Sequence, residues 1–245
     1  LGISKSNSDI LVAGAQDNGT ERLSSNYWDA IRGSDGMECI IDPYDVNTIY
    51  SSSQYGGIKR TYDADNPSGA TWSDFKPVTY DGAWVTPYKM HPLNNNMIVA
   101  GYDEVYRTTT GGAFWDSISN LQIGQLRIIA LAPSDENVIY ASTYATLYVT
   151  FDGGINWNRI DNGLPNSISD VTVSANNPNW VWVTCSNYTN GDKVYESTDG
   201  GNTWSNISGT NLPNLPVNCI VYQDLTNDDL YIGTDIGIYH KDNTM

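Results

Sequence analysis

Short runs of apolar residues recur along the whole chain. Six of them have the composition of β-strands, at positions 11–14, 49–52, 98–101, 139–142, 181–184 and 230–233. Most follow another apolar run that ends at a proline, as in residues 39–43 and 128–133. Proline cannot donate a hydrogen bond to a sheet, so it fits the end of a strand. No segment repeats its apolar residues with the helical period, and the pattern therefore predicts an all-β protein without a parallel α/β sheet.

A tryptophan followed three positions later by an apolar residue marks a second repeat. The five copies begin at Trp28, Trp72, Trp115, Trp157 and Trp204, so they are 42 to 47 residues apart. Each interval holds an apolar run, a β-rich run, an aromatic strand and the tryptophan strand, with turns between them. Four antiparallel strands every 40–50 residues are typical of β-propeller blades. The sequence therefore predicts a propeller with about six four-stranded blades.

The same repeat predicts how complete the propeller is. Residues 1–4 read as the remainder of a first strand, and the next tryptophan is due at about position 248, beyond Met245. We expect residues 1–245 to form a single, incomplete β-propeller domain whose sixth unit lacks its fourth strand. A seventh blade would close the ring and remove the exposed sheet edges. We therefore expect seven blades in the complete protein, of which this chain is a fragment.

The turn before the tryptophan strand carries a motif with a local physical role. It reads Ser-Thr-Asp-Gly-Gly-Asn-Thr-Trp at 197–204 and Thr-Phe-Asp-Gly-Gly-Ile-Asn-Trp at 150–157, with degenerate copies at 108–115 and 61–72. The aspartate accepts hydrogen bonds from N–H groups of the turn, glycine adopts a positive φ, and the tryptophan ring is buried. We predict a structural role for Asp152, Gly154, Trp157, Asp199, Gly201 and Trp204.

These turns resemble the Asp-box, or BNR, repeat of secreted β-propeller proteins. The resemblance covers the chain and implies a relation to sialidases, to tandem-propeller glycoside hydrolases active on xyloglucan and to the sortilin ectodomain. Segments 13–20, 34–39 and 231–239 are also similar to propeller modules of Bacteroidetes surface proteins exported by the type IX secretion system. The resemblance implies a secreted or cell-surface protein in which the Asp-box itself is structural.

Charge and composition narrow the choice of partners. The formal net charge is −16, although only 16% of the residues are charged, and 12 lysines and arginines leave few groups to neutralise phosphates. We therefore expect no nucleic acid and no anionic membrane surface as a partner, and no apolar stretch reaches the length of a membrane span. A glycan, a protein, and other domains or subunits of the parent protein stay open as partners.

The three cysteines, Cys39, Cys185 and Cys219, form no disulfide framework and no CxxC motif. We interpret them as small buried residues. A Cys185–Cys219 bridge stays open, because the two residues fall on strands of adjacent units. The chain has no calcium-loop spacing, P-loop or dinucleotide motif, so we predict neither a bound metal nor a cofactor.

Antiparallel connectivity sorts the turns onto two ends of the blades. The motif turns share one end. The turns from second to third strand and the blade-to-blade loops share the other, at the mouth of the central channel, and these are rich in tyrosine, aspartate, glutamine and asparagine. Aromatic platforms beside planar polar groups suit sugar rings, although such residues are also ordinary in turns. The predicted ligand-binding residues are Tyr55, Trp84, Tyr102, Tyr144 and Tyr188.

Hydrolysis of a glycosidic bond needs two carboxylates about 5–10 Å apart. At the mouth end only Asp17, Asp35 and Glu38 form a candidate catalytic group. The turn around Asp17 resembles the one that bears a catalytic aspartate in the tandem-propeller hydrolases, although Gln16-Asp17-Asn18-Gly19 departs from it. There the resemblance implies that the other carboxylate comes from a second propeller. A sialidase is disfavoured, because none of the six arginines falls at a mouth-facing turn.

Two functions are therefore open. The first is a non-catalytic propeller module of a secreted or surface protein that binds a glycan or a protein at the channel mouth. The alternative is part of a glycoside hydrolase acting on a β-glucan-type polysaccharide, with its second carboxylate outside this chain. The placement of the Asp17, Asp35 and Glu38 carboxylates discriminates between them.

Overall fold

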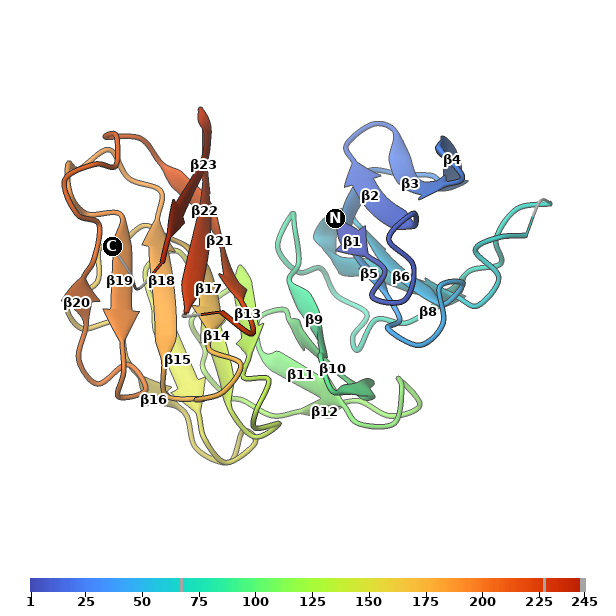
Figure 1. The fold of residues 1–245 in the computed structure, drawn as a ribbon. Helices are drawn as coiled ribbons and strands as arrows, with labels where there is room; N and C mark the ends of the chain where they lie inside the picture. The colour runs from blue at the N-terminus through green and yellow to red at the C-terminus, as the bar shows by residue number, and fades with distance from the viewer. Residues whose placement is uncertain (67, 227, 243–245) are drawn as a thin grey trace. The chain divides into compact units, whose positions relative to one another are not determined.

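The computed structural model describes residues 1–66, 68–226 and 228–242, which form antiparallel sheets almost throughout (Figure 1). The chain divides into two compact units, Leu1–Ser117 and Ile118–Met245. The strands of the first unit are β1 (Gly2–Ile3), β2 (Leu11–Ala15), β3 (Gly19–Ser24), β4 (Tyr27–Arg32), β5 (Gly36–Ile41), β6 (Ile49–Ser53), β7 (Gly57–Thr61), β8 (Ser73–Asp74), β9 (Tyr88–His91), β10 (Asn94–Gly101), β11 (Val105–Thr108) and β12 (Asp116–Ser117). A 3-10 turn, Gln54–Gly56, separates β6 from β7.

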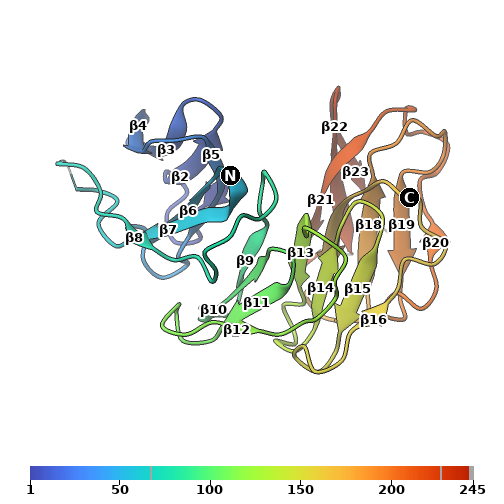
Figure 2. The same cartoon turned by 180° about the vertical axis from the view of Figure 1, so that it is seen from behind.

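The second unit is built in the same way, and Figure 2 shows it from behind. Its strands are β13 (Ile128–Leu131), β14 (Ile139–Ser142), β15 (Leu147–Thr150), β16 (Asn158–Arg159), β17 (Ile168–Val173), β18 (Val181–Cys185), β19 (Val194–Ser197), β20 (Ser205–Asn206), β21 (Val217–Gln223), β22 (Asp229–Thr234) and β23 (Gly237–Lys241).

Each sheet is a meander in which consecutive strands pair in antiparallel register. The described residues form five sheets of four strands and one of three, the last being β21–β22–β23. The prediction of six repeated units, with the sixth lacking a fourth strand, is therefore confirmed for the described residues. The tryptophan strands β8, β12, β16 and β20 contain two residues each and start just after the tryptophan, whereas β4 spans six residues and includes Trp28.

The first strands of successive sheets pack against one another within each unit. In the first unit β5 contacts both β1 and β9, and in the second β17 contacts both β13 and β21. Among the second strands, β14 and β18 are buried along their whole length, and only the last residue of β6 is partly exposed. Burial on both faces explains why these strands read as apolar runs and not as an alternation of polar and apolar residues.

Three of the repeat tryptophans donate a hydrogen bond to a backbone carbonyl one repeat earlier. The indole nitrogen Nε1 of Trp204 donates to the carbonyl oxygen of Ile160 at 2.7 Å, and Trp157 donates to Ile118 at 2.7 Å. In the first unit Trp72 donates to the Ile31 carbonyl at 2.8 Å. Each acceptor is the apolar residue three positions after the preceding tryptophan. The Trp-x-x-apolar spacing therefore encodes a contact between successive repeats.

The second glycine of the motif makes that contact possible. Gly201 has φ 90°, and a Cβ placed on it would lie 2.4 Å from the side-chain Cδ1 of Ile160. The equivalent Cβ on Gly112 would lie 2.1 Å from the Phe75 ring. Only glycine avoids both the strained φ and the clash, so this position is fixed by packing as well as by the turn.

The motif aspartate accepts hydrogen bonds from its own turn. The Asp199 carboxylate accepts from the backbone N of Thr203 at 2.9 Å, from its hydroxyl at 2.6 Å and from the Ser197 hydroxyl at 2.8 Å. These bonds favour the charged form and lower the pKa of Asp199 to about 2. The insertion-bearing copy behaves alike, because bonds from Thr61, Thr71 and Asn66 lower the pKa of Asp63 to about 2.

The cysteines are unpaired. Cys39 and Cys185 are buried and Cys219 is exposed, so a Cys185–Cys219 bridge is absent from the structure, and Cys219 departs from the expectation that all three are buried. Burial raises the pKa of the Cys39 and Cys185 thiols to about 11.

Candidate functional site

The turns between second and third strands contact the loops that lead to the next sheet. The backbone N of Asp17 donates to the Asp35 carboxylate at 2.9 Å, the backbone N of Tyr55 donates to the Trp84 carbonyl at 3.1 Å, and that of Ile168 donates to the Tyr144 carbonyl at 2.9 Å. Each pair joins a turn to the following loop. The prediction that these segments share one end of their sheets is therefore confirmed in both units.

The Asp17 and Asp35 segments are held together by backbone packing. Asp17 has φ 67°, and the Asp35 carboxylate caps its N–H. Beside them, a Cβ on Gly36 would lie 1.9 Å from the Gly19 carbonyl, so the two segments approach as closely as backbones can. One oxygen of Asp35 is thus engaged in fixing the Asp17 turn.

Glu38, the third predicted acid, lies on β5. Its side chain is about one-third exposed and pairs with the ammonium of Lys89 on β9 at 3.7 Å. Its backbone carbonyl accepts from the Tyr88 hydroxyl at 2.8 Å. The structure thus brings Asp17 and Asp35 into contact, whereas Glu38 has a partner of its own on the neighbouring sheet.

Tyr55 and Trp84 form an exposed aromatic pair. Their ring centroids are 5.0 Å apart at 88°, an edge-to-face contact, and 46% of Tyr55 and 37% of Trp84 are exposed. Two backbone bonds fix the pair, from Tyr55 N to the Trp84 carbonyl at 3.1 Å and from Gly82 N to the Tyr55 carbonyl at 3.0 Å. Tyr55 also has φ 60°, a conformation that costs about 1–3 kcal/mol for a residue other than glycine. Such strain at an exposed aromatic residue is typical of binding sites.

Tyr102 lies beneath this pair and corrects one prediction. It was expected to face a ligand, but its side chain is fully buried and its hydroxyl donates to the Gly56 carbonyl at 2.6 Å. Gly56 and Gly82 pack directly on it, because a Cβ on either would lie within 3.0 Å of the Tyr102 ring. Burial raises the pKa of Tyr102 and keeps the hydroxyl protonated. Tyr102 therefore supports the aromatic surface and does not form part of it.

Tyr80, which is 41% exposed, and the partly buried Tyr106 also pack on Tyr102, and the sequence analysis missed both. Their rings pack edge-on against Tyr102, each with centroids 6.1 Å away. The Tyr80 hydroxyl donates to the Asp103 carboxylate and is hydrogen-bonded to the Tyr106 hydroxyl. Burial and the bond to Asp103 raise the pKa of Tyr80. We call Tyr55, Tyr80, Trp84, Asp103 and Tyr106 the aromatic patch. The only signal for Tyr80 was its position directly before the Asp81–Trp84 loop.

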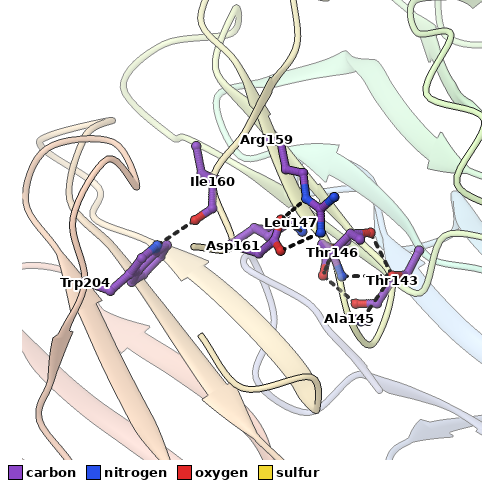
Figure 3. A network of polar contacts seen from close by, with 9 residues as sticks. Thr143, Ala145, Thr146, Leu147, Arg159, Ile160, Asp161 and Trp204 are labelled. Carbon is purple, nitrogen blue, oxygen red and sulfur yellow. Dashed lines mark hydrogen bonds and ion pairs between the residues drawn. The ribbon is translucent and has the colours of Figure 1, made fainter. Parts of the chain in front are cut away.

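In the second unit Tyr144 lies on a turn that is closed by a hydrogen bond between two threonine side chains. Figure 3 shows the hydroxyls of Thr143 and Thr146 hydrogen-bonded at 2.8 Å. The backbone N of the next residue, Leu147, donates to the Asp161 carboxylate at 3.4 Å. The Arg159 guanidinium donates two more bonds to the same carboxylate, at 2.7 and 2.9 Å.

Both predicted binding residues of this unit are exposed, and an arginine joins one of them. Tyr144 is 54% exposed, and the guanidinium carbon of Arg127 lies 4.9 Å from the centre of its ring. Tyr188 is also exposed, with no ring contact of its own among the described residues. Arg127 directly precedes β13 and reaches Tyr144 with its side chain, a contact that its place outside the predicted mouth-facing turns did not indicate.

In the part of the chain that the structure describes, no group of three or more His, Cys, Asp or Glu side chains is placed so that it could hold a metal ion. None of the described helical segments has the length and apolar character to cross a membrane.

The known proteins that the chain resembles are β-propeller proteins. The model of the family Sortilin-Vps10 (sortilin, neurotensin receptor 3) matches residues 103–214, less than half of the chain. A xyloglucanase of Hypocrea jecorina is 22% identical over 155 residues, which are 62% of this chain and 18% of that protein.

Solved structures extend the likeness over nearly all of the chain. The GH74 enzyme of Niastella koreensis has a TM-score of 0.72 at 17% identity, covering 98% of this chain and 44% of its own. The GH74 xyloglucanase of Xanthomonas campestris has a TM-score of 0.56 at 13% identity, with 98% and 51% covered. YCF48 of Cyanidioschyzon merolae has a TM-score of 0.72 at 14% identity, with 97% and 80% covered.

The chain resembles the β-propellers of sortilin and the GH74 enzymes. Together with the meander sheets this gives the fold, a β-propeller of four-stranded antiparallel blades, as predicted. The chain spans about half or less of these GH74 structures and less than a fifth of the Hypocrea xyloglucanase.

Proposed function

We propose that this propeller is a non-catalytic module of a secreted or cell-surface protein and that its aromatic patch binds a glycan. The observation that carries the proposal is the exposed Tyr55–Trp84 pair, held by two backbone bonds and a strained Tyr55. A pair fixed in this way loses little conformational freedom when a ligand binds, which favours binding by a small exposed surface. We take residues 1–245 as one β-propeller domain, incomplete relative to a closed ring.

The chemistry of the patch favours a neutral sugar. Aromatic faces pack against the C–H bonds of a pyranose ring, while Asp103 and the Tyr106 hydroxyl offer hydrogen-bond partners to its hydroxyl groups. A net charge of −16 disfavours an anionic polysaccharide. Because proteins named xyloglucanases share the fold, we propose a β-glucan of the xyloglucan kind as the ligand class.

Export to the cell surface is part of the same proposal. The likeness to secreted propeller proteins and the glycan-type surface both support an extracellular protein. The type IX secretion route rests on the resemblance of segments 13–20, 34–39 and 231–239 alone.

A glycan array probed with the labelled chain tests the binding proposal. We expect signal on neutral β-glucan oligosaccharides, and loss of that signal for Trp84→Ala and Tyr55→Ala. Tyr44→Ala is the matched control, because Tyr44 is 73% exposed on the same unit without a ring contact. No glycan signal, or equal signal from the Trp84→Ala variant, contradicts the proposal.

The second candidate is a glycoside hydrolase that uses Asp17, Asp35 or Glu38. The contact between the Asp17 and Asp35 segments favours it, since it brings two acids of one sheet end together. Against it stand the capping role of Asp35 and the Glu38–Lys89 pair, which engage two of the three carboxylates. Release of reducing ends from xyloglucan by the chain, abolished in Asp17→Asn but not in Trp84→Ala, would favour the hydrolase over the binding module.

A further inference from the structure

A pocket of about 670 Å³ opens in the first unit, between strands β3 and β4 and the insertion-bearing motif turn of the second repeat. The strands and the turn between them contribute Arg22, Ser24, Tyr27 and Asp29, and the motif turn contributes Asp65. This volume is typical of sites for small ligands. The pocket shares no residue with the aromatic patch, so a ligand bound here is independent of the proposed function.

Arg22 is the buried charged residue of the pocket, with 7% of its surface exposed. A guanidinium has five N–H donors. In the described part of the chain Nη2 of Arg22 donates to Oδ1 of Asn47 at 3.4 Å, and Nε is buried without a partner. A buried donor without an acceptor costs free energy. Arg22 therefore favours a ligand that supplies an acceptor to its guanidinium.

The next sheet shows which acceptor such an arginine has when the motif turn is short. Arg60 pairs with Tyr50 in the ladder of β6 and β7, as Arg22 pairs with Val12 in that of β2 and β3, and both partners are the second residue of their strand. Nη1 of Arg60 donates to the Gly111 carbonyl at 2.6 Å. The acceptor of this arginine is therefore a backbone carbonyl in the motif turn of the following repeat.

The insertion deprives Arg22 of that acceptor. From the motif aspartate to the tryptophan there are nine positions in the second repeat, against five in the copies at 150–157 and 197–204. Ala64 is the counterpart of Gly111, because the backbone N of each donates to an asparagine carbonyl of the turn before the second strand, at 3.2 and 3.0 Å. Gly111 has φ 61°, whereas Ala64 has no positive φ, and its carbonyl receives no bond from Arg22. The longer turn thus leaves a donor without its usual partner at an open pocket.

The other lining groups favour a neutral ligand that is rich in hydroxyl groups. Asp29 and Asp65 are exposed carboxylates, which accept hydrogen bonds and repel an anion. A sugar hydroxyl both donates and accepts, so it suits a lining that holds a guanidinium and two carboxylates. Tyr27, which is 75% exposed, offers an aromatic face to a pyranose ring.

We propose that this pocket is a second carbohydrate site, at which a neutral pyranose accepts hydrogen bonds from the Arg22 guanidinium. The hydroxyl groups of the sugar donate to Asp29 and Asp65, and Tyr27 packs against one face of the ring. The pocket lies at the end of the sheets that carries the motif turns, whereas the aromatic patch lies at the opposite end. One chain therefore holds two sugar units at separate places.

Ligand-observed NMR titration of the chain tests this inference. The probes are the methyl β-glycosides of glucose, galactose, mannose and xylose, and methyl β-glucuronide is their acidic counterpart. The titration uses the Trp84→Ala variant, so that the outcome does not depend on the aromatic patch. We expect saturable binding of at least one neutral glycoside and weaker binding of the glucuronide. No saturable binding of any neutral glycoside overturns the proposal, and so does tighter binding of the glucuronide, which would make the pocket a carboxylate site.

Variants of the pocket locate the binding. Arg22→Met keeps the length of the side chain and removes its donors, and we expect about tenfold weaker binding of the neutral glycoside. The melting temperature should not fall, because the guanidinium has one long hydrogen bond within the described chain, whereas a purely structural arginine would lower it on removal. Arg107→Met is the matched control, because Arg107 directly precedes the motif threonine of the third repeat, as Arg60 does in the second. It should leave the binding unchanged.

Asp29→Ala, at an exposed position of the same pocket, keeps the test valid if Arg22→Met does not fold, which circular dichroism checks. We expect it to weaken the neutral glycoside as well. Unchanged binding in folded Arg22→Met overturns the proposal, as does unchanged binding in Asp29→Ala where the arginine variant does not fold.

Discussion

The indole nitrogen of Trp204 donates to the carbonyl oxygen of Ile160 at 2.7 Å and so ties one sheet to the preceding one. Trp204→Phe removes the donor but keeps a ring, and we expect a loss of about 1 kcal/mol in the free energy of unfolding. Trp204→Ala also empties the space beneath the indole, and we expect a loss of about 2–4 kcal/mol. Urea denaturation measures both. A Trp204→Ala variant as stable as the parent would show that the tryptophan does not fasten the sheets.

Gly201 is expected to tolerate no side chain. Gly201→Ala places a Cβ 2.4 Å from Ile160 Cδ1 at φ 90°, whereas Gly209→Ala meets nothing within 4 Å at φ 62°. The Gly209 variant carries only the backbone strain of about 1–2 kcal/mol. Thermal denaturation should rank Gly201→Ala as the clearly less stable of the two. Equal melting temperatures would mean that Ile160 yields without cost.

Stability is expected to fall between about pH 4 and pH 2. The pKa of Asp199 and of Asp63 is about 2 in the folded chain, below the value of about 3.9 for unfolded aspartate. The unfolded chain therefore binds more protons in this window, and stability decreases as the pH falls through it. Melting temperatures measured from pH 6 to pH 2 should show a shallower decline for Asp199→Asn. Asp9→Asn, at an exposed aspartate outside the motif, is the control.

Thiol reactivity distinguishes the three cysteines. Cys219 is exposed, whereas burial raises the pKa of Cys39 and Cys185 to about 11 and shields both sulfurs. We expect a chromogenic disulfide reagent at pH 8 to titrate one thiol in the native chain and three in denaturant. A count of one in denaturant without reductant would reveal a bridge that the structure lacks.

The fold was predictable because the residues of its repeated contact recur at a regular spacing. The tryptophan contacts the preceding repeat, and the apolar residue three positions later accepts a hydrogen bond from the next one. The repetition of this pair indicated six units. What the spacing did not reveal is that the backbone carbonyl of Ile31, Ile118 or Ile160 accepts the next indole N–H. A backbone acceptor leaves no trace in residue identity, so this link required the structure.

The candidate site was only partly predictable, because exposure depends on neighbours from other strands. Tyr55 and Trp84 are exposed as expected, but Tyr102 is buried by two glycines that leave room for its ring. Tyr80 lies just outside the loop that the turn pattern marked. Asp35 looked like a candidate acid in sequence, while in space its carboxylate caps Asp17. Sequence finds the right end of the sheets but not which side chains remain available there.

The association constant of the chain for a xyloglucan oligosaccharide tests the central claim most directly. Isothermal titration calorimetry should compare the parent chain with Trp84→Ala, Tyr55→Ala and the control Tyr44→Ala. The proposal predicts measurable binding by the parent and by Tyr44→Ala, and at least tenfold weaker binding by the two patch variants. Equal binding by the parent and Trp84→Ala would contradict a glycan site at the aromatic patch.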